Sequence, residues 1–225
     1  NANPTVSPTI VDSNDVTTTL TGDSNKFIRH YSNAKITFDA ISKKGATIKR
    51  RKVTNGGQSL AADGTINGVT SGQFTFIVED SRGNSIEENV SKTLIEYVKL
   101  SCIIDNTQPS TDGSFTFKVS GSYFNGSFGA IANTLNVYYR YKVSGGSYPE
   151  YAPMIVTKSG NTYTATVNLT GLDYQKNYIF QAYAVDKLET ATTGEKPTKA
   201  LPVFDWSATD FNVNEIVQMR RGSVV

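Results

Sequence analysis

Apolar and polar residues alternate along many short stretches of this chain. A period of two is typical of β-strands that turn one face to a core and the other to solvent. The pattern is clearest from Tyr178 to Val185, where Tyr178, Phe180, Ala182 and Ala184 share one phase. Three further inward sets precede it: Phe115, Phe117 and Val119; Leu135, Val137, Tyr139, Tyr141 and Val143; and Tyr163, Ala165, Val167 and Leu169. We therefore predict consecutive half-buried strands.

The first half of the chain shows the same alternation with one interruption. Its inward sets are Ile36, Phe38 and Ala40, then Phe74, Phe76 and Val78. The segment 80–84, DSRGN, contains a glycine and predicts a turn. The segment 46–53, ATIKRRKV, breaks the pattern because Arg50 and Lys52 fall in phase with Ile48. It indicates an edge strand or a strand with a bulge.

Long amphipathic helical patterns are absent from the sequence. Short strands separated by turn residues are typical of β-sandwiches, and two sandwiches of about a hundred residues fit better than one of twice that size. The predicted fold class is all-β, with two tandem immunoglobulin-like or fibronectin type III-like sandwiches at residues 1–97 and 98–201. Residues 202–225 are predicted to be a linker to a further domain.

Leu172 and Tyr178 lie in the spacing expected at the corner between strands E and F of a sandwich. A tyrosine there buries its ring and bonds its hydroxyl to upstream backbone. This corner, the segment 162–172 as strand E and 135–146 as strand C resemble a fibronectin type III domain. The chain departs from that pattern in one respect, because its single tryptophan, Trp206, lies beyond the sandwich.

The composition and net charge exclude some classes of binding partner. The net charge of the 225 residues is only +2, and neither half has the basic excess of a nucleic-acid binder. A single cysteine, Cys102, excludes an intrachain disulfide, and its apolar surroundings favour a buried structural thiol. No apolar run approaches the length of a membrane span. The chain begins at Asn1, which we interpret as a piece of a longer polypeptide. We expect no nucleic-acid and no membrane partner.

The sequence contains few residues that could act in catalysis or bind a metal ion. His30 is the only histidine, and no nucleophile motif accompanies it, so we expect a turn or surface residue. Glu79 with Asp80, and Glu87 with Glu88, are sequence neighbours that point to opposite faces of a strand, unlike the facing carboxylates of a glycosidase. A calcium site at Asp12, Asp15, Asp23 and Asp105 stays a minor alternative, because no calcium-loop motif is present. We predict no enzyme activity, no cofactor and no metal.

Two surface features suggest contacts. The basic residues Lys43, Lys44, Lys49, Arg50, Arg51 and Lys52 are either a charged edge strand, which we favour, or a site for anionic wall polymers. The aromatic residues predicted to contact a glycan or another subunit are Tyr123, Phe124, Phe128, Tyr148, Tyr151 and Trp206. The alternative for the first five is that they cap the ends of the sandwich.

Longer stretches carry a narrower resemblance. The segments 3–28, 32–56 and 72–100, with PVFDWSATDFNVN at 202–214, resemble the tandem immunoglobulin-like region of tail-tip (baseplate) minor structural proteins from siphophages of Gram-positive hosts. Phe204, Asp205 and Trp206, then Asp210, Phe211 and Asn212, match the segment that closes this region. The residues after 214 depart from that pattern.

This resemblance implies a non-enzymatic structural and adhesion segment at the tail tip of a virion. The implied partners are other tail-tip subunits, with a homotrimer in the full-length protein, and a host cell-wall glycan. Two alternatives stay open. One is the stalk of an adhesin on a bacterial cell surface. The other is a set of accessory modules of a glycan hydrolase.

Overall fold

The computed structural model describes residues 3–106, 113–173, 175–198, 204–206 and 211–213. The chain is all-β, and it divides into two compact units. Unit 1 comprises residues 1–98 and 124–133, and unit 2 comprises 99–123 and 134–225. The predicted domain limits of 1–97, 98–201 and 202–225 stay a prediction.

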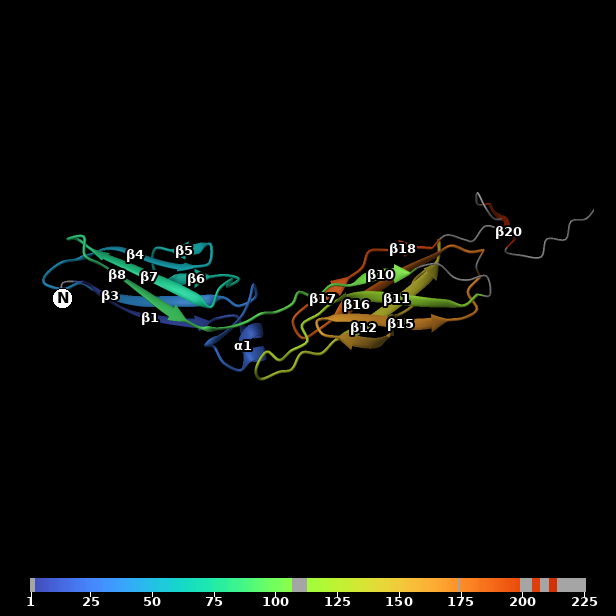
Figure 1. Ribbon diagram of the computed structural model, residues 1–225, viewed down its shortest axis with the longest axis horizontal. Coiled ribbons are helices and arrows are strands. Elements are labelled where there is room, and N and C mark those ends of the chain that lie inside the picture. Colours follow the sequence, from blue (N-terminus) through green and yellow to red (C-terminus); the bar gives the residue numbers. More distant parts are fainter. Residues whose placement is uncertain (1–2, 107–112, 174, 199–203, 207–210, 214–225) are drawn as a thin grey trace, which may run out of the picture. The chain divides into compact units, whose positions relative to one another are not determined.

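Unit 1 is an immunoglobulin-like sandwich of a three-stranded and a four-stranded antiparallel sheet, ordered β1-β3-β6 and β5-β4-β7-β8 (Figure 1). Its alternating strands meet around a core that includes Ile36, Phe38, Phe74, Phe76 and Val78, as predicted. The strands of the two sheets are β1 (Thr5–Asp12), β3 (Ala34–Ile41), β4 (Ile48–Asn55), β5 (Gln58–Leu60), β6 (Gly64–Ile66), β7 (Gln73–Asp80) and β8 (Ser85–Ser91).

The register of β4 explains the interrupted pattern at Ala46–Val53. Pairing with β7 shifts between Ile48 and Arg50, and pairing with β5 covers only Val53–Asn55. The strand therefore has both a bulge and an edge portion, which confirms the prediction. The bulge returns Ile48 and Val53 to the core side, while Lys49 and Arg50 are exposed.

A short helix and a parallel strand pair were not anticipated from the sequence. Helix α1 (Asp15–Thr21) begins after Asn14, whose side chain accepts a hydrogen bond from Val16 N, and ends at Gly22 with φ 67°. These are standard capping residues, but seven residues are too few to show a helical period. Strands β2 (Lys26–Ile28) and β9 (Thr93–Ile95) pair in parallel.

A polar hub holds the segment around α1. The buried Asp12 carboxylate accepts four hydrogen bonds, from Thr17 Oγ1 at 2.5 Å, Ser32 Oγ at 2.6 Å, and the backbone N–H groups of Asn14 and Asn33 at 3.0 Å each. Burial of a carboxylate is tolerated when its oxygens are satisfied in this way. Asp12 thereby ties the end of β1 to the start of α1 and to the turn before β3.

Residues Phe124–Asn133 follow β11 (Phe115–Ser122) in sequence but belong to unit 1. Their N–H groups at Ala130 and Ile131 donate to the carbonyls of Thr21 and Leu20, at 3.2 Å each, at the end of α1. The last carbonyls of a helix have no partner within the helix, so this segment completes α1. Phe128 is fully buried and stacks on Tyr97 at 6.0 Å.

Unit 2 is a second immunoglobulin-like sandwich, with sheets ordered β10-β11-β15-β14 and β13-β12-β16-β17, and with β18 also pairing to β16 (Figure 1). The chain passes from one sheet to the other at Met154, between β13 and β14. The strands are β10 (Ile103–Asn106), β11 (Phe115–Ser122), β12 (Asn136–Val143), β13 (Ala152–Pro153), β14 (Ile155–Ser159), β15 (Thr162–Leu169), β16 (Tyr178–Val185), β17 (Thr190–Thr192) and β18 (Lys196–Pro197).

The predicted tyrosine corner is confirmed. Tyr178 is the first residue of β16, only 5% exposed, and its hydroxyl accepts a hydrogen bond from the backbone N–H of Asp173 at 2.9 Å. Leu172 is buried beside it. One inward assignment is wrong: Val143 is 43% exposed, because β12 ends there and its side chain passes the edge of the core.

Beyond the second sandwich, β19 (Phe204–Trp206) pairs antiparallel with β20 (Phe211–Val213). The register places Trp206 opposite Phe211.

Candidate functional site

The outer face of the β12–β16 sheet in unit 2 carries a cluster of aromatic and cationic side chains. Alternation along β12 sends Val137, Tyr139 and Tyr141 toward the core, so Tyr138, Arg140 and Lys142 lie on the outer face. The antiparallel register sets Tyr138 opposite Tyr183 and Arg140 opposite Gln181. We call this cluster the outer aromatic face; its members are Tyr138, Arg140, Lys142, Tyr148, Tyr151, Gln181 and Tyr183.

Arg140 organises the outer aromatic face. Its guanidinium carbon lies 4.3 Å from the ring centre of Tyr148 and 4.3 Å from that of Tyr151. Its Nε and Nη2 donate to Gln181 Oε1 at 2.9 and 2.7 Å. These contacts fix the guanidinium on both rings, and they draw the loop between β12 and β13 over the sheet.

The rings also contact one another. Tyr138 stacks on Tyr183 with centres 4.9 Å apart, and Tyr151 meets Tyr183 edge-on at 4.7 Å. Burial raises the pKa of Tyr183, and the hydroxyls of Tyr138 and Tyr151 add to the rise. The cluster is therefore held together by its own packing.

Tyr148 is the polar end of the cluster. Its hydroxyl donates to Glu195 Oε1 at 3.0 Å. Burial raises the pKa of Tyr148 to about 12; the Glu195 carboxylate adds to the rise and Arg140 opposes it. The phenol therefore stays protonated at neutral pH and keeps Glu195 as its acceptor. Lys142 Nζ also lies 4.4 Å from the centre of this ring.

The predicted site residues separate into different places. Tyr148 and Tyr151 come together on the outer aromatic face. Tyr123 is 1% exposed in the core of unit 2, edge-on to Tyr163 at 6.2 Å. Phe124 and Phe128 contact Tyr97 in unit 1, Phe128 with no exposed surface. Tyr123 and Phe128 thus offer no ring face to a ligand. Trp206 lies in β19, and its side chain falls outside the described residues.

Sequence reasoning missed Arg140, Lys142, Tyr138, Gln181 and Tyr183. The available signal was the alternation of β12, which places Tyr138, Arg140 and Lys142 on the face opposite the predicted inward set. The pairing of β12 with β16 is not visible in a linear pattern, so the partners on β16 could not be assigned.

The basic residues of the first half lie on β4 and in the segment before it, and several of them contact neighbouring groups. Lys49 pairs with Glu79 at 2.8 Å, and the Arg51 guanidinium lies 5.8 Å from the centre of the Phe38 ring. The carbonyl of Lys44 accepts from Arg82 Nη2. Residues 48–52 of β4 do not pair with β5. This charged part of the strand is therefore an edge, in agreement with the interpretation that we favour.

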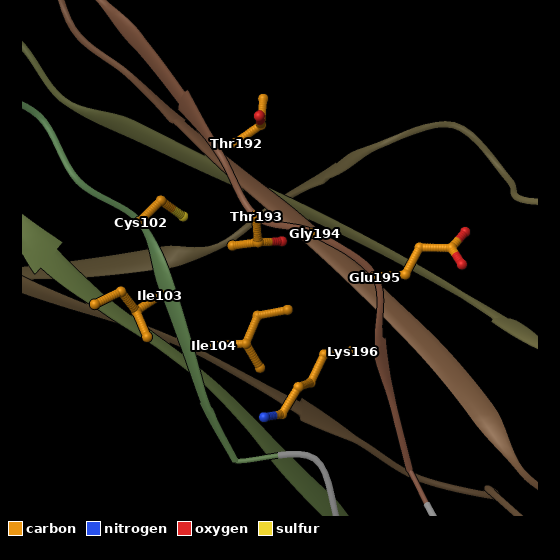
Figure 2. A pocket seen from close by; sticks show the side chains of 8 residues that line it. All are labelled: Cys102, Ile103, Ile104, Thr192, Thr193, Gly194, Glu195 and Lys196. Atoms are coloured by element: carbon orange, nitrogen blue, oxygen red, sulfur yellow. The ribbon is translucent and has the colours of Figure 1, made fainter.

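A groove of about 310 Å³ lies in unit 2 between β10 and the segment from β17 to β18 (Figure 2). Figure 2 shows Cys102 and Ile104 on one side of it and Thr193 and Lys196 on the other. Burial raises the pKa of the Cys102 thiol, although a hydrogen bond with Tyr163 lowers it. Cys102 is half-buried, less than predicted, and a raised pKa disfavours the reactive thiolate form.

The candidate acid–base residues are separate or structural. His30 occupies an exposed turn at φ 67°, as expected. The carboxylate of Asp80 accepts hydrogen bonds from the backbone of Arg82 and Asn84 and so closes the predicted turn. Among the described residues, no group of three or more His, Cys, Asp or Glu side chains is placed to hold a metal ion.

Within the same residues, no helix is both long and apolar enough to cross a membrane.

Comparison with solved structures gives matches at low sequence identity. The chain is similar to the Dpr2 Ig1-Ig2 complex with DIP-Theta Ig1-Ig3, with 13% identity, a TM-score of 0.32, and coverage of 85% of this chain and 63% of that one. It is also similar to the three N-terminal domains of the outer capsid protein Hoc of bacteriophage RB49, with 10% identity, a TM-score of 0.32, and coverage of 88% of this chain and 68% of that one. For the N-terminal eight Ig domains of DSCAM the identity is 13% and the TM-score is 0.29, and the match covers 77% of this chain and 25% of that one.

This chain thus spans less than two thirds of the first and third of these structures. No protein-family model and no curated protein matches the sequence. The TM-scores are low, so the fold assignment rests on the strand topology itself.

Proposed function

We propose that this chain is a non-enzymatic structural and adhesion segment of a phage tail-tip (baseplate) protein, where it spaces and supports host-recognition domains. The observation that carries the proposal is that each unit closes its own hydrophobic core. One core gathers residues from β10 to β16, and the other gathers residues from β1 to β8. A folded module with its own core keeps a fixed length under load, as a spacer requires. The sequence resemblance of the segments 3–28, 32–56, 72–100 and 202–214 supports the location at the tail tip.

Antibody labelling tests the location. Antibodies raised against the purified chain are applied to virus particles and to bacteria from the culture that carries the gene. We expect gold particles at the tail tip by electron microscopy, and reduced adsorption of the phage to its host. Labelling of the bacterial surface, with unlabelled virions, would contradict the tail-tip proposal and favour the adhesin stalk.

The absence of enzyme activity is a separate part of the proposal. The purified chain is incubated with host cell wall, and reducing ends and free amines are measured over time. We expect no release above buffer. Turnover that disappears on substitution of one acidic residue would instead identify a wall hydrolase.

We further propose that the β19–β20 hairpin contacts either the second sandwich or a neighbouring subunit of a full-length homotrimer. Aromatic residues dominate protein contacts, and the segment Phe204–Phe211 brings Phe204, Trp206 and Phe211 close in sequence. Trp206 is the only tryptophan, so its fluorescence reports on this segment alone. Docking predicts blue-shifted emission that is protected from quenchers. Water-like emission in both the isolated chain and the assembled tail would exclude docking.

A further inference from the structure

Arg140 and Lys142 are cations without an ion-pair partner among the described residues. The ion pairs formed by lysines of unit 2 are Lys118 with Asp105 and Lys176 with Asp173. In the part of the chain that the structure describes, neither Arg140 nor Lys142 forms an ion pair. The carboxylate of Glu195 receives the hydroxyl of Tyr148 instead. The outer aromatic face therefore carries two cations that no ion pair holds, and these can contact an external anion.

Both cations are positioned in advance by aromatic rings. The Arg140 guanidinium and the Lys142 ammonium lie 4.3 and 4.4 Å from the centre of the same Tyr148 ring. Gln181 holds Arg140 through Nε and Nη2, which leaves Nη1 without a hydrogen-bond partner among the described residues. Groups fixed before binding lose less conformational entropy when a ligand arrives. The face has the properties of a prepared oxyanion site.

The same contacts reduce what the rings offer to a neutral sugar. A sugar stacks on an open aromatic face, but Tyr148 already contacts two cations and Tyr183 already contacts both Tyr138 and Tyr151. The unsatisfied groups on this surface are charges rather than rings. Recognition should therefore depend on a negative charge carried by the ligand.

We propose that the outer aromatic face binds an acidic carbohydrate, with Arg140 and Lys142 contacting its carboxylate or phosphate oxygens. The proposal rests on the adhesion role proposed above, which makes a carbohydrate the ligand. Tyr148, Tyr151 and Gln181 are positioning residues that hold the two cations. Neutral glycans should bind weakly or not at all.

Calorimetric titration of the purified chain tests the proposal with four probes. Polygalacturonate supplies carboxylates, dextran phosphate supplies phosphates, dextran is a neutral polysaccharide, and polyglutamate is an acidic polymer without sugar. We expect binding of at least one of the first two, little binding of dextran or polyglutamate, and weakening as sodium chloride is added. The first two probes distinguish carboxylate from phosphate as the preferred anion.

Substitutions locate the site. Lys142→Gln and Arg140→Gln should each weaken binding about tenfold or more, as expected when a hydrogen bond to a charged group is lost. Lys158→Gln is the matched control, because Lys158 Nζ lies 5.3 Å from the centre of the Tyr123 ring on the other sheet. It should leave the affinity unchanged. Circular dichroism of each variant verifies folding, and Lys142→Gln still tests the proposal if Arg140→Gln misfolds.

Several results would overturn this assignment. They are equal binding of dextran, equal binding of polyglutamate, no binding of either acidic carbohydrate, or loss of binding only on Arg50→Gln and Lys52→Gln in unit 1. If antibody labelling marks the tail tip while the acidic carbohydrates do not bind, the proposed function stands and this inference fails. If the carbohydrates bind while labelling fails, the reverse holds.

Discussion

The two units have the same kind of fold but stabilise it differently. Six of the buried polar or charged residues among the described positions, Asp12, Thr17, Thr21, Ser32, Asn55 and Asp80, lie in unit 1, and only Thr198 lies in unit 2. Unit 2 relies almost entirely on apolar packing: the Phe180 ring lies 4.7 Å from Phe117, 5.2 Å from Phe115 and 5.2 Å from Tyr141, measured between centres.

The reason lies in what each unit must accommodate. Unit 1 contains α1, the parallel β2–β9 pair and the segment 124–133, and these interrupt a regular sandwich. Backbone N–H groups in irregular segments need acceptors, which Asp12 and Asn55 provide. Both units also bury aromatic rings, among them Phe38 and Phe76 in unit 1 and Phe117 and Phe180 in unit 2. The comparison teaches that buried polar groups accompany the irregular segments of unit 1, whereas the apolar core is common to both sandwiches.

The largest expected effect comes from removing a central ring. Phe180→Ala should destabilise unit 2 by about 3–5 kcal/mol, because a fully buried ring leaves a cavity. Hydrogen exchange followed by mass spectrometry reads the two units separately, and protection should fall mainly in unit 2. Ile155→Ala, at a site 78% exposed, is the control and should change little. Equal loss of protection in both units would contradict separate cores.

Removing the polar hub should act on the other unit. Asp12→Ala leaves four donors without their acceptor and should destabilise unit 1 by about 2–4 kcal/mol. Chemical denaturation with the same exchange readout measures it, and α1 should lose protection first. Asp12→Asn, which keeps part of the acceptor capacity, should be milder. If Asp12→Ala destabilised unit 1 less than Asp12→Asn does, the hydrogen bonds of the hub would not be what stabilises unit 1.

A smaller effect is expected at the tyrosine corner. Tyr178→Phe keeps the buried ring and removes only the acceptor of the Asp173 N–H, so unit 2 should lose about 1 kcal/mol. The midpoint of urea unfolding gives the change. Tyr178→Ala, which also removes the ring, should be several times worse. Equal effects of the two variants would mean that the ring, and not its hydroxyl, contributes little.

The smallest effect concerns pH. Hydrogen bonds from the Asn84 side chain, with those of the Asn84 and Arg82 backbone, hold the pKa of Asp80 below its ordinary value of 3.8, against the effect of burial. The folded pKa is thus below the unfolded pKa. Ionised Asp80 therefore contributes stability above the unfolded pKa, and this contribution is lost as the pH falls through the folded pKa.

The pKa of Asp23, also in unit 1, is lowered chiefly by a backbone hydrogen bond from Asn25. Unit 1 should therefore lose stability below about pH 4, seen as a falling urea midpoint between neutral pH and about pH 3. Asp80→Asn should flatten that dependence. An unchanged slope in this variant would assign the pH dependence to other carboxylates.

Much of the fold could be read from the sequence, because a strand's inward face is a local property. Phe74, Phe76 and Val78, like Phe115, Phe117 and Val119, follow the period of two that any half-buried strand imposes. The Tyr178 corner was predictable for a similar reason, since its hydroxyl reaches backbone five positions away. The break in alternation at Ile48–Lys52 likewise reflects a local bulge.

Only the tertiary structure decided which distant residues meet. The packing of Tyr148 and Tyr151 on Arg140 depends on the path of the loop between β12 and β13, and the contact with Gln181 depends on the register of β12 on β16. The assignment of residues 124–133 to unit 1 depends on the carbonyls at the end of α1 that have no partner within the helix. Alternation shows which side of a strand is buried, but pairing and loop geometry determine its neighbours. The core residues could therefore be predicted from the linear pattern. The outer aromatic face could not, because it depends on the alignment of β12 with β16 and on the path of the loop after β12.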